Sequence, residues 1–290
     1  MFIGIDHGTT SLRFSTGDTW FKISREEARE FRWQDLGRLC PLNEIEGIAL
    51  TYSMGDRITM ITPIQDVENR GVVSREGAGK HVGGGTRVFD QVRQSGLPAL
   101  VIPGLHRGSP TDGRFKVYSH QASPEKIGIA YRVARDLGSG FVVSDVSSNT
   151  VTLLVTGGRI TGAFDACIFS PGLEHGALDV AAIRKIDAGE ITANEAFRTA
   201  GVNHTLPPDM RTQAVAMFAA MECAAMLLLS PLAGVALAGT LAPLVADGVS
   251  VLLERPVKVY DEWSASQGLA WIARDVFSGR KEILGIGVDM

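Results

Sequence analysis

Apolar runs of strand length recur along the chain, and helical patterns follow most of them. The predicted strands cover residues 2–5, 12–16, 47–51, 58–64, 99–102, 140–146, 151–155 and 235–238. The predicted helices cover residues 24–39, 86–95, 124–137, 192–201 and 214–229, and a last helix begins near residue 261. Several of them open with a capping box or with proline at the first helical position. Strand pairs followed by helices predict α/β units rather than a β-sandwich.

The first hairpin places an acid and hydroxyl residues at a tight turn. Asp6 lies at the end of the first strand, and the turn consists of His7, Gly8, Thr9 and Thr10. Glycine lets another group approach the backbone closely, and turn amides and hydroxyls donate to phosphate oxygens. A carboxylate at this position suits a hard cation that accompanies phosphates. The turn therefore predicts a polyphosphate site, with a hydroxyl-rich edge hairpin as the structural alternative.

A second hairpin repeats this design in the other half of the chain. Asp145 follows an apolar strand, and the residues after it are Val146, Ser147, Ser148, Asn149 and Thr150. A further small strand ends in Gly239-Thr240, and the stretch Ser264–Ala270 has small residues inside a helical pattern. Small residues allow two helices to approach closely. The paired hairpins indicate an internal duplication.

In this order, the four segments resemble the acetate kinase, sugar kinase, Hsp70 and actin superfamily. A narrower resemblance is to the acetate and butyrate kinase branch and to an archaeal family called methanogenesis marker protein twelve. It is carried by Gly4–Thr10, by the block Ser119–Lys126 and by Phe169-Ser170-Pro171-Gly172. The resemblance implies an α/β protein with two ribonuclease-H-like lobes, which is the actin-like ATPase fold, and a nucleotide cleft between the lobes. The first lobe is expected over residues 1–130 and the second over 131–290, with the final helix (about 261–290) returning to the first lobe.

The resemblance also implies ATP and Mg²⁺ as cofactors. Asp6 and Asp145 would hold the metal through water. The nucleotide would meet His7, Gly8, Thr9 and Thr10 in one lobe, and Ser147, Ser148, Asn149, Thr150, Gly239 and Thr240 in the other. Two departures stand against efficient turnover: the second hairpin lacks the glycines usual in acyl-phosphate kinases, and the adenosine segment has a single glycine.

Candidate substrate residues lie between the two hairpins. Arg107 follows a strand end, where its guanidinium could bind a carboxylate or phosphate bidentately, or form a surface ion pair. His120 precedes a helix N-cap and could act as an acid or base near neutral pH, although a hydrogen bond within its loop is the favoured alternative. The glycine-rich run 76–86 is not a P-loop, because His81 stands where a hydroxyl residue should follow Lys80. It is interpreted as a surface loop or a substrate lid.

Composition excludes several classes of protein. The formal net charge is −4 and 21% of residues are charged, which provides no long-range attraction to nucleic acid or to an anionic membrane. The three cysteines form no Cys-x-x-Cys pair, which fits a reducing cytoplasm. The chain shows no signal peptide. The stretch Ala214–Leu229 is too short for a membrane span and contains Glu222, so it predicts a buried helix.

Two functions are consistent with these observations. The first is an ATPase or phosphotransferase of archaeal methanogenic metabolism, acting on a small acid or a protein partner. The second is a catalytically impaired nucleotide-sensing or structural protein of the same fold. A homodimer is also expected, because the stretch from Ala214 has more apolar surface than one lobe needs and kinases of the acetate branch pair through their second lobe.

Overall fold

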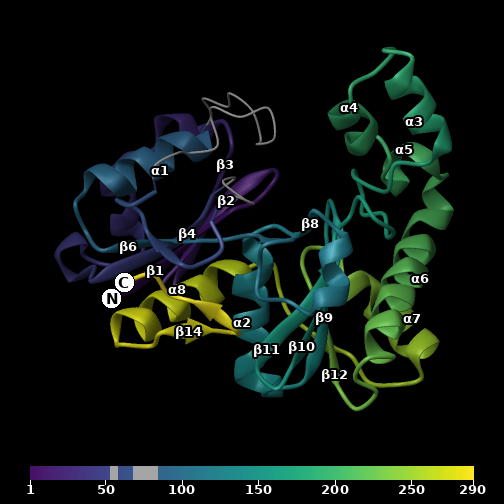
Figure 1. The fold of residues 1–290 in the computed structure, drawn as a ribbon. Coiled ribbons are helices and arrows are strands. Elements are labelled where there is room, and N and C mark those ends of the chain that lie inside the picture. The colour runs from purple at the N-terminus through teal and green to yellow at the C-terminus, as the bar shows by residue number, and fades with distance from the viewer. Residues whose placement is uncertain (53–57, 68–83) are drawn as a thin grey trace. The chain divides into compact units, whose positions relative to one another are not determined.

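The computed structural model describes residues 1–52, 58–67 and 84–290, which form two compact units. Unit 1 consists of Met1–Asp136, Gly158–Ile160 and Trp263–Met290, and unit 2 consists of Leu137–Gly157 and Thr161–Glu262. Each unit is built around its own β-sheet (Figure 1). The last segment of the chain therefore belongs to the same unit as the N-terminal hairpin.

The sheet of unit 1 has six strands in the order β3-β2-β1-β4-β6-β5. Their bounds are β1 Phe2–His7, β2 Ser11–Ser15, β3 Trp20–Ser24, β4 Gly47–Thr51, β5 Thr62–Pro63 and β6 Ala99–Ile102. The first three strands are antiparallel neighbours, whereas β4 is parallel to β1 and β6 is parallel to β4. The predicted strands 47–51 and 99–102 are confirmed, and the strand expected over 58–64 is reduced to β5.

The sheet of unit 2 has the order β11-β10-β9-β12-β13. Its strands are β9 Phe141–Val146, β10 Thr150–Thr156, β11 Arg159–Phe164, β12 Gly234–Ala238 and β13 Lys258–Val259. Here too the first two strands, β9 and β10, are antiparallel, β12 is parallel to β9, and β13 is parallel to β12. The order of these five strands matches that of β3-β2-β1-β4-β6 in the first sheet, where β5 is an additional edge strand, and this match supports the duplication that the paired hairpins predicted.

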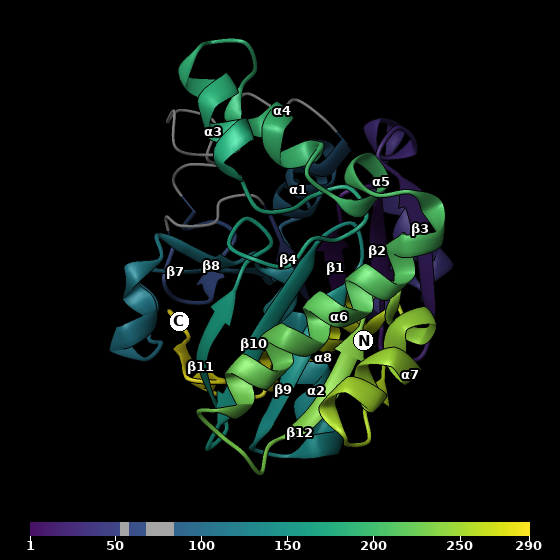
Figure 2. The same ribbon diagram turned by 90° about the vertical axis from the view of Figure 1, so that its right-hand side faces the viewer.

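Helices cover both sheets. In unit 1 they are α1 Gly84–Gln94, α2 Glu125–Leu137 and α8 Ser264–Phe277, with 3₁₀ turns η1 Glu27–Glu30, η2 Trp33–Arg38, η3 Leu42–Glu44 and η5 Gly113–Val117. In unit 2 they are α3 Val180–Asp187, α4 Ala193–Arg198, α5 Val202–Thr205, α6 Pro208–Leu227 and α7 Ala242–Leu253. Figure 2 shows α6 and α7 side by side over the second sheet. Two short ribbons, β7 Leu105–His106 with β8 His120–Ala122 and β14 Glu282–Ile283 with β15 Ile286–Gly287, complete unit 1.

Glycines let α8 approach both β1 and α2. A Cβ atom added at Gly4 would lie 2.0 Å from the carbonyl oxygen of Ser266, and one added at Gly268 would lie 1.8 Å from that of Gly128. Contacts this short leave no room for any side chain. The close packing expected from the small residues of 264–270 is confirmed.

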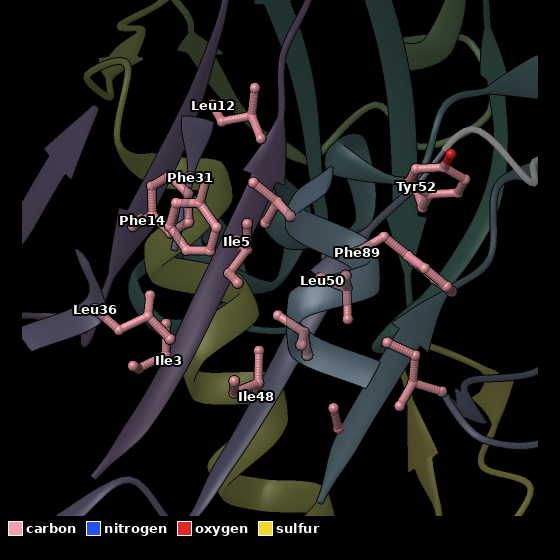
Figure 3. Close-up of a cluster of buried hydrophobic side chains, with 14 of the residues drawn as sticks. Ile3, Ile5, Leu12, Phe14, Phe31, Leu36, Ile48, Leu50, Tyr52 and Phe89 are labelled. Carbon is pink, nitrogen blue, oxygen red and sulfur yellow. The ribbon is translucent and has the colours of Figure 1, made fainter. Parts of the chain in front are cut away.

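The core of unit 1 lies on the other face of β1, because successive side chains of a strand point to opposite faces. Ile3 and Ile5 are fully buried there with Phe14, whose ring stacks on Phe21 at 4.6 Å and on Phe31 at 5.4 Å between centroids (Figure 3). This aromatic stack explains why the helix expected over 24–39 is absent. The predicted capping box does form between Ser24 and Glu27, but the chain turns extended at Phe31 (φ −54°, ψ 135°), which buries the ring.

The helix expected over 214–229 is present as α6, and one of its faces is buried while the other is exposed. Met217 and Met221 are 41% and 47% exposed, whereas Ala219 and Cys223 on the opposite face are completely buried. Among the helices of the described ranges, α6 included, none combines the length and the hydrophobicity that a membrane crossing requires.

Candidate functional site

The first candidate site is the turn between β1 and β2. Asp6 is buried, and its carboxylate forms an ion pair with the guanidinium of Arg13, its cross-strand neighbour, at a distance of 3.5 Å. Glycine suits position 8, because an added Cβ would lie 2.9 Å from the backbone carbonyl oxygen of Ser11. Thr9 and Thr10 are exposed at the tip of the turn. The turn therefore presents hydroxyl groups to solvent in front of a buried carboxylate, an arrangement suited to a phosphate and its metal ion.

His7 and Arg25 hold this turn in place. The Nε2 atom of His7 lies 3.2 Å from the carbonyl oxygen of Gly85, and the guanidinium of Arg25 donates to the carbonyl oxygen of Gly8 at 2.7 and 2.9 Å. Burial, with the nearby charge of Arg25, lowers the pKa of His7 to about 3. The imidazole is therefore neutral at physiological pH, so His7 brings no positive charge to a phosphate. Its predicted contact with the nucleotide stays a prediction.

The second candidate site is the turn between β9 and β10. Asp145 accepts a 3.0 Å hydrogen bond from Ser147, whose hydroxyl oxygen accepts one of 3.1 Å from the backbone N–H of Thr240. Gly239 has φ +93°, and a Cβ added there would lie 2.2 Å from the Asp145 carboxylate. Parallel pairing of β9 and β12 sets Ala238 opposite Asp145 and so brings these sequence-predicted residues together.

The rest of this turn binds a loop that sequence reasoning did not connect to it. We call residues 170–175 the clasp loop. Its backbone N–H groups at Glu174 and His175 both donate to the carbonyl oxygen of Ser148 at 3.1 Å. The Thr150 hydroxyl donates to the carbonyl oxygen of Pro171 at 2.8 Å, and the ring of His175 is hydrogen bonded to the side chain of Asn149. Ser148, Asn149 and Thr150 therefore hold the clasp loop in this structure.

Helix α6 fixes the other end of the clasp loop. The backbone N–H of Ser170 donates to Glu222 at 3.2 Å, and its hydroxyl donates to the carbonyl oxygen of Phe218 at 3.0 Å. Burial raises the pKa of Glu222 to about 7, although hydrogen bonds from Thr152 and Ser170 oppose the shift. Sequence reasoning used Glu222 only as evidence against a membrane span. A lone acid inside an apolar helix is the signal that could have marked it, because a buried acid needs polar partners.

The two candidate substrate residues, Arg107 and His120, both have partners from the segment 105–122 of unit 1. The Arg107 guanidinium donates to the carbonyl oxygens of Lys116 and Val117 at 3.0 and 3.3 Å. His120 lies on β8 opposite His106 of β7. Their catalytic roles stay predictions. Of the glycine-rich run 76–86, residues 76–83 lie outside the described residues, whereas Gly84–Thr86 form the start of α1 and not a loop.

The carboxylates of the two turns suit a Mg²⁺ ion that would be bound mainly by phosphate and water oxygens. Among residues 1–52, 58–67 and 84–290, no group of three or more His, Cys, Asp and Glu side chains is arranged to hold a metal ion. Among these residues, a metal held by Asp6 or Asp145 would therefore take most of its ligands from phosphate and water oxygens. Mg²⁺ beside phosphates is commonly bound in this manner.

Comparison with known proteins gives both a family and a fold. The chain is 44% identical to a UPF0285 protein of Methanosarcina mazei over an alignment covering 99% of each chain. Its fold is similar to a propionate kinase from Francisella tularensis (TM-score 0.59, 10% identity, 94% of this chain and 98% of that chain). It is also similar to a ROK hexokinase from Thermus thermophilus (TM-score 0.53, 15% identity, 96% of this chain and 99% of that chain). No protein-family model matches the sequence.

Proposed function

The chain belongs to the archaeal UPF0285 family and has the actin-like ATPase fold, and from this premise we propose that it binds Mg-ATP as an ATPase or phosphotransferase. The observation that carries the proposal is the repeated hairpin. In both units an aspartate lies near the end of the first strand of a sheet of the same topology, directly before a turn with hydroxyl residues. A chance hydroxyl-rich turn would not be expected at equivalent positions of two sheets.

The residues of the two turns have complementary roles in this proposal. Thr9, Thr10 and the amides of the first turn bind phosphate oxygens, and Asp6 and Asp145 hold Mg²⁺ through water. When bound, Mg²⁺ neutralises charge on the phosphates, which is the main requirement of phosphoryl transfer. Gly239 and Thr240 contact the adenosine beside the second turn.

A second candidate function, nucleotide sensing without efficient turnover, is favoured by the clasp loop. Backbone N–H groups of the clasp loop donate to the carbonyl oxygen of Ser148, and other groups of the loop form hydrogen bonds with the side chains of Asn149 and Thr150. Fewer groups of the second turn are then available to a phosphate than a glycine-rich turn offers. Both candidate functions therefore require nucleotide binding, and they differ in whether phosphate is released.

The cellular setting and the acceptor are also part of the proposal. The relatives come from methanogenic archaea, so we propose a cytoplasmic role linked to methanogenic metabolism. The acceptor is a small acid or a protein partner. We also propose that the chain belongs to the acetate and butyrate kinase branch of the superfamily.

Mg-ATP is expected to raise the melting temperature, because a ligand that binds only the folded state stabilises it by mass action. At a hundredfold excess over the dissociation constant the gain is about 2.7 kcal/mol. Calorimetric titration with Mg-ATP and Mg-ADP, followed by a phosphate-release assay, measures binding and turnover separately. Binding with release supports the enzyme, and binding without release supports the sensor. No shift with millimolar Mg-ATP, Mg-ADP or a non-hydrolysable analogue would exclude both.

We further propose that two copies of the chain associate through α6. Met210, Met217, Met221 and Leu228 follow one another at spacings of seven, four and seven residues, and all are exposed. From residue 212 to 246 the chain has a single charged side chain, the buried Glu222. An apolar, uncharged stripe of this kind suits a second copy of itself, because no like charges oppose each other across a two-fold axis.

Substitution of Met221 by Glu is expected to convert the dimer into a monomer, because it places a charge in the proposed interface. The matched control is Val117→Glu, which introduces the same charge at an exposed apolar side chain of unit 1. Light scattering across micromolar concentrations measures the mass of each protein. A monomeric mass for the unmodified chain would exclude the dimer.

A further inference from the structure

Three arginines share one carboxylate where helices α2 and α8 end. Arg135 lies in the last turn of α2, Arg274 lies in the last turn of α8, and Arg280 follows α8. All three guanidinium groups donate to the carboxylate of Asp275, at 2.7, 3.3 and 3.4 Å in chain order. The hydroxyl of Tyr131, on α2, donates to the same carboxylate. We call the three arginines the arginine cluster.

A structural role explains only part of this cluster. A single arginine neutralises Asp275, and Arg135 does so with the shortest contact. Cations in the last turn of a helix also balance the helix dipole, which amounts to roughly half a negative charge at each C-terminus. One carboxylate and two helix ends therefore offset about two of the three positive charges. The remaining positive charge has no balancing anion within the cluster.

The acids that flank the cluster in sequence have cations of their own. Asp136 is paired with Arg132 at 3.0 Å, and Glu282 is paired with Arg159 at 2.7 Å. Lys281 is exposed and adds a further positive charge next to the cluster. The whole chain, by contrast, has a formal net charge of −4. The positive excess is therefore a local feature of this surface.

The arginine cluster is open to solvent and has unused hydrogen-bond donors. The side chains of Arg135, Arg274 and Arg280 are 38%, 47% and 55% exposed. Each guanidinium has five N–H donors in a planar fork. Within the described residues, each of these guanidinium groups forms hydrogen bonds through one of its nitrogen atoms. The other nitrogen atoms can bind the oxygens of an incoming carboxylate, which matches the fork in geometry.

A tryptophan borders the cluster and extends the surface. Trp271 is partly exposed, and the guanidinium of Arg135 lies 5.4 Å from its ring centre. Arginine and tryptophan are among the residues that contribute most to binding at protein–protein interfaces. An isolated exposed ion pair adds little affinity. The site therefore suits a partner large enough to cover the guanidinium groups and the indole together, rather than a small free anion.

We propose that the arginine cluster and Trp271 form a docking surface for a partner protein that presents aspartate or glutamate side chains. The partner's carboxylates bind the exposed guanidinium groups, and the surface around them packs against the indole. Asp275 holds the arginines in place and competes with the partner for them. The docking surface lies within unit 1 and does not depend on nucleotide binding.

The test measures binding of a fluorescent oligoglutamate peptide to the full chain by anisotropy at low salt. The main variant is Arg274→Gln with Arg280→Gln, which leaves Arg135 paired with Asp275 and so preserves the link between the two helices. The matched control is Arg29→Gln with Arg114→Gln, because these exposed arginines of unit 1 also pair with a carboxylate. Melting curves verify that each variant is folded. A single-stranded DNA oligonucleotide of the same net charge is the competing anion.

The unmodified chain and the control are expected to bind the peptide, and added salt should weaken this binding by screening the charges. The cluster variant should lose about tenfold or more in affinity, as is typical when central interface arginines are removed. No binding by the unmodified chain, equal losses in the cluster variant and the control, or tighter binding of the DNA than of the peptide would each overturn the proposal.

A second variant, Asp275→Asn, separates docking from a purely structural role. Asparagine still accepts a hydrogen bond but is no anion, so it no longer competes with the partner for the arginines. The peptide is therefore expected to bind this variant more tightly than it binds the unmodified chain. If the cluster served only to join the two helices, the substitution would lower the melting temperature and leave the peptide affinity unchanged, and that result would count against the docking surface.

Discussion

Asp6→Asn and Asp145→Asn are each expected to weaken Mg-ATP binding strongly or to abolish turnover, with the fold nearly intact. Asparagine has the same shape as aspartate and still accepts a hydrogen bond, so Arg13 and Ser147 retain their partners. What is lost is the negative charge that holds Mg²⁺ and its waters.

The structural alternative makes the opposite prediction for the same variants. If these carboxylates only accept hydrogen bonds that hold their turns, each asparagine should cost on the order of 1 kcal/mol of stability and leave nucleotide affinity unchanged. Melting curves with and without Mg-ATP separate the two cases. Asp18→Asn, at an exposed position between β2 and β3, is the matched control. Unchanged affinity in both variants would end the metal assignment and most of the kinase-like interpretation with it.

Much of the fold follows from local sequence patterns. The runs 47–51 and 99–102 were predicted as strands with the bounds that β4 and β6 have, because each is a short run of mainly apolar residues, which is typical of a buried strand. The capping box at Thr192 forms as expected, with reciprocal bonds to Glu195. The aspartates of the two hairpins were selected as candidates for the same reason. Each lies next to a short apolar run, which is a signal that a single sequence window contains.

The parts that could not be predicted depend on contacts between distant segments. From the sequence, the residues after Asp145 were interpreted as a phosphate-binding turn that lacks the usual glycines. In the structure the side chain of Asn149 is hydrogen bonded to the ring of His175, a residue 26 positions away. Similarly, the helix expected over 24–39 gives way to burial of Phe31 against Phe14. In both cases a long-range contact outweighs the local preference, and no pattern within either segment reports it.

The stability of the folded protein is expected to depend on pH through Glu222. Its pKa is raised to about 7 in the fold, mainly by burial, from an ordinary value of 4.5. Asp165, on the segment after β11, adds a repulsive negative charge, and the neighbouring thiol of Cys223 has its own pKa raised by burial and by Glu222. Because the folded state holds the proton more tightly, Glu222 contributes most below about pH 4.5, and the contribution falls as the pH rises to 7. The shift corresponds to about 3 kcal/mol.

Glu222→Gln is therefore expected to gain stability relative to the unmodified chain as the pH rises. Glutamine still accepts the hydrogen bond from the backbone N–H of Ser170 but does not titrate, so it avoids the cost of a buried charge. The difference in unfolding free energy, variant minus unmodified chain, should increase by about 3 kcal/mol between pH 4.5 and pH 8. Denaturant unfolding at several pH values measures this difference, and all other titrating groups cancel in it. Glu190→Gln, at an exposed position of unit 2, gives the baseline for the same chemical change. A difference that stays constant with pH would show that the contacts with Ser170 and Thr152 stabilise the ionised form as well as water does. In that case the link between α6 and the clasp loop would be equally strong on both sides of neutral pH.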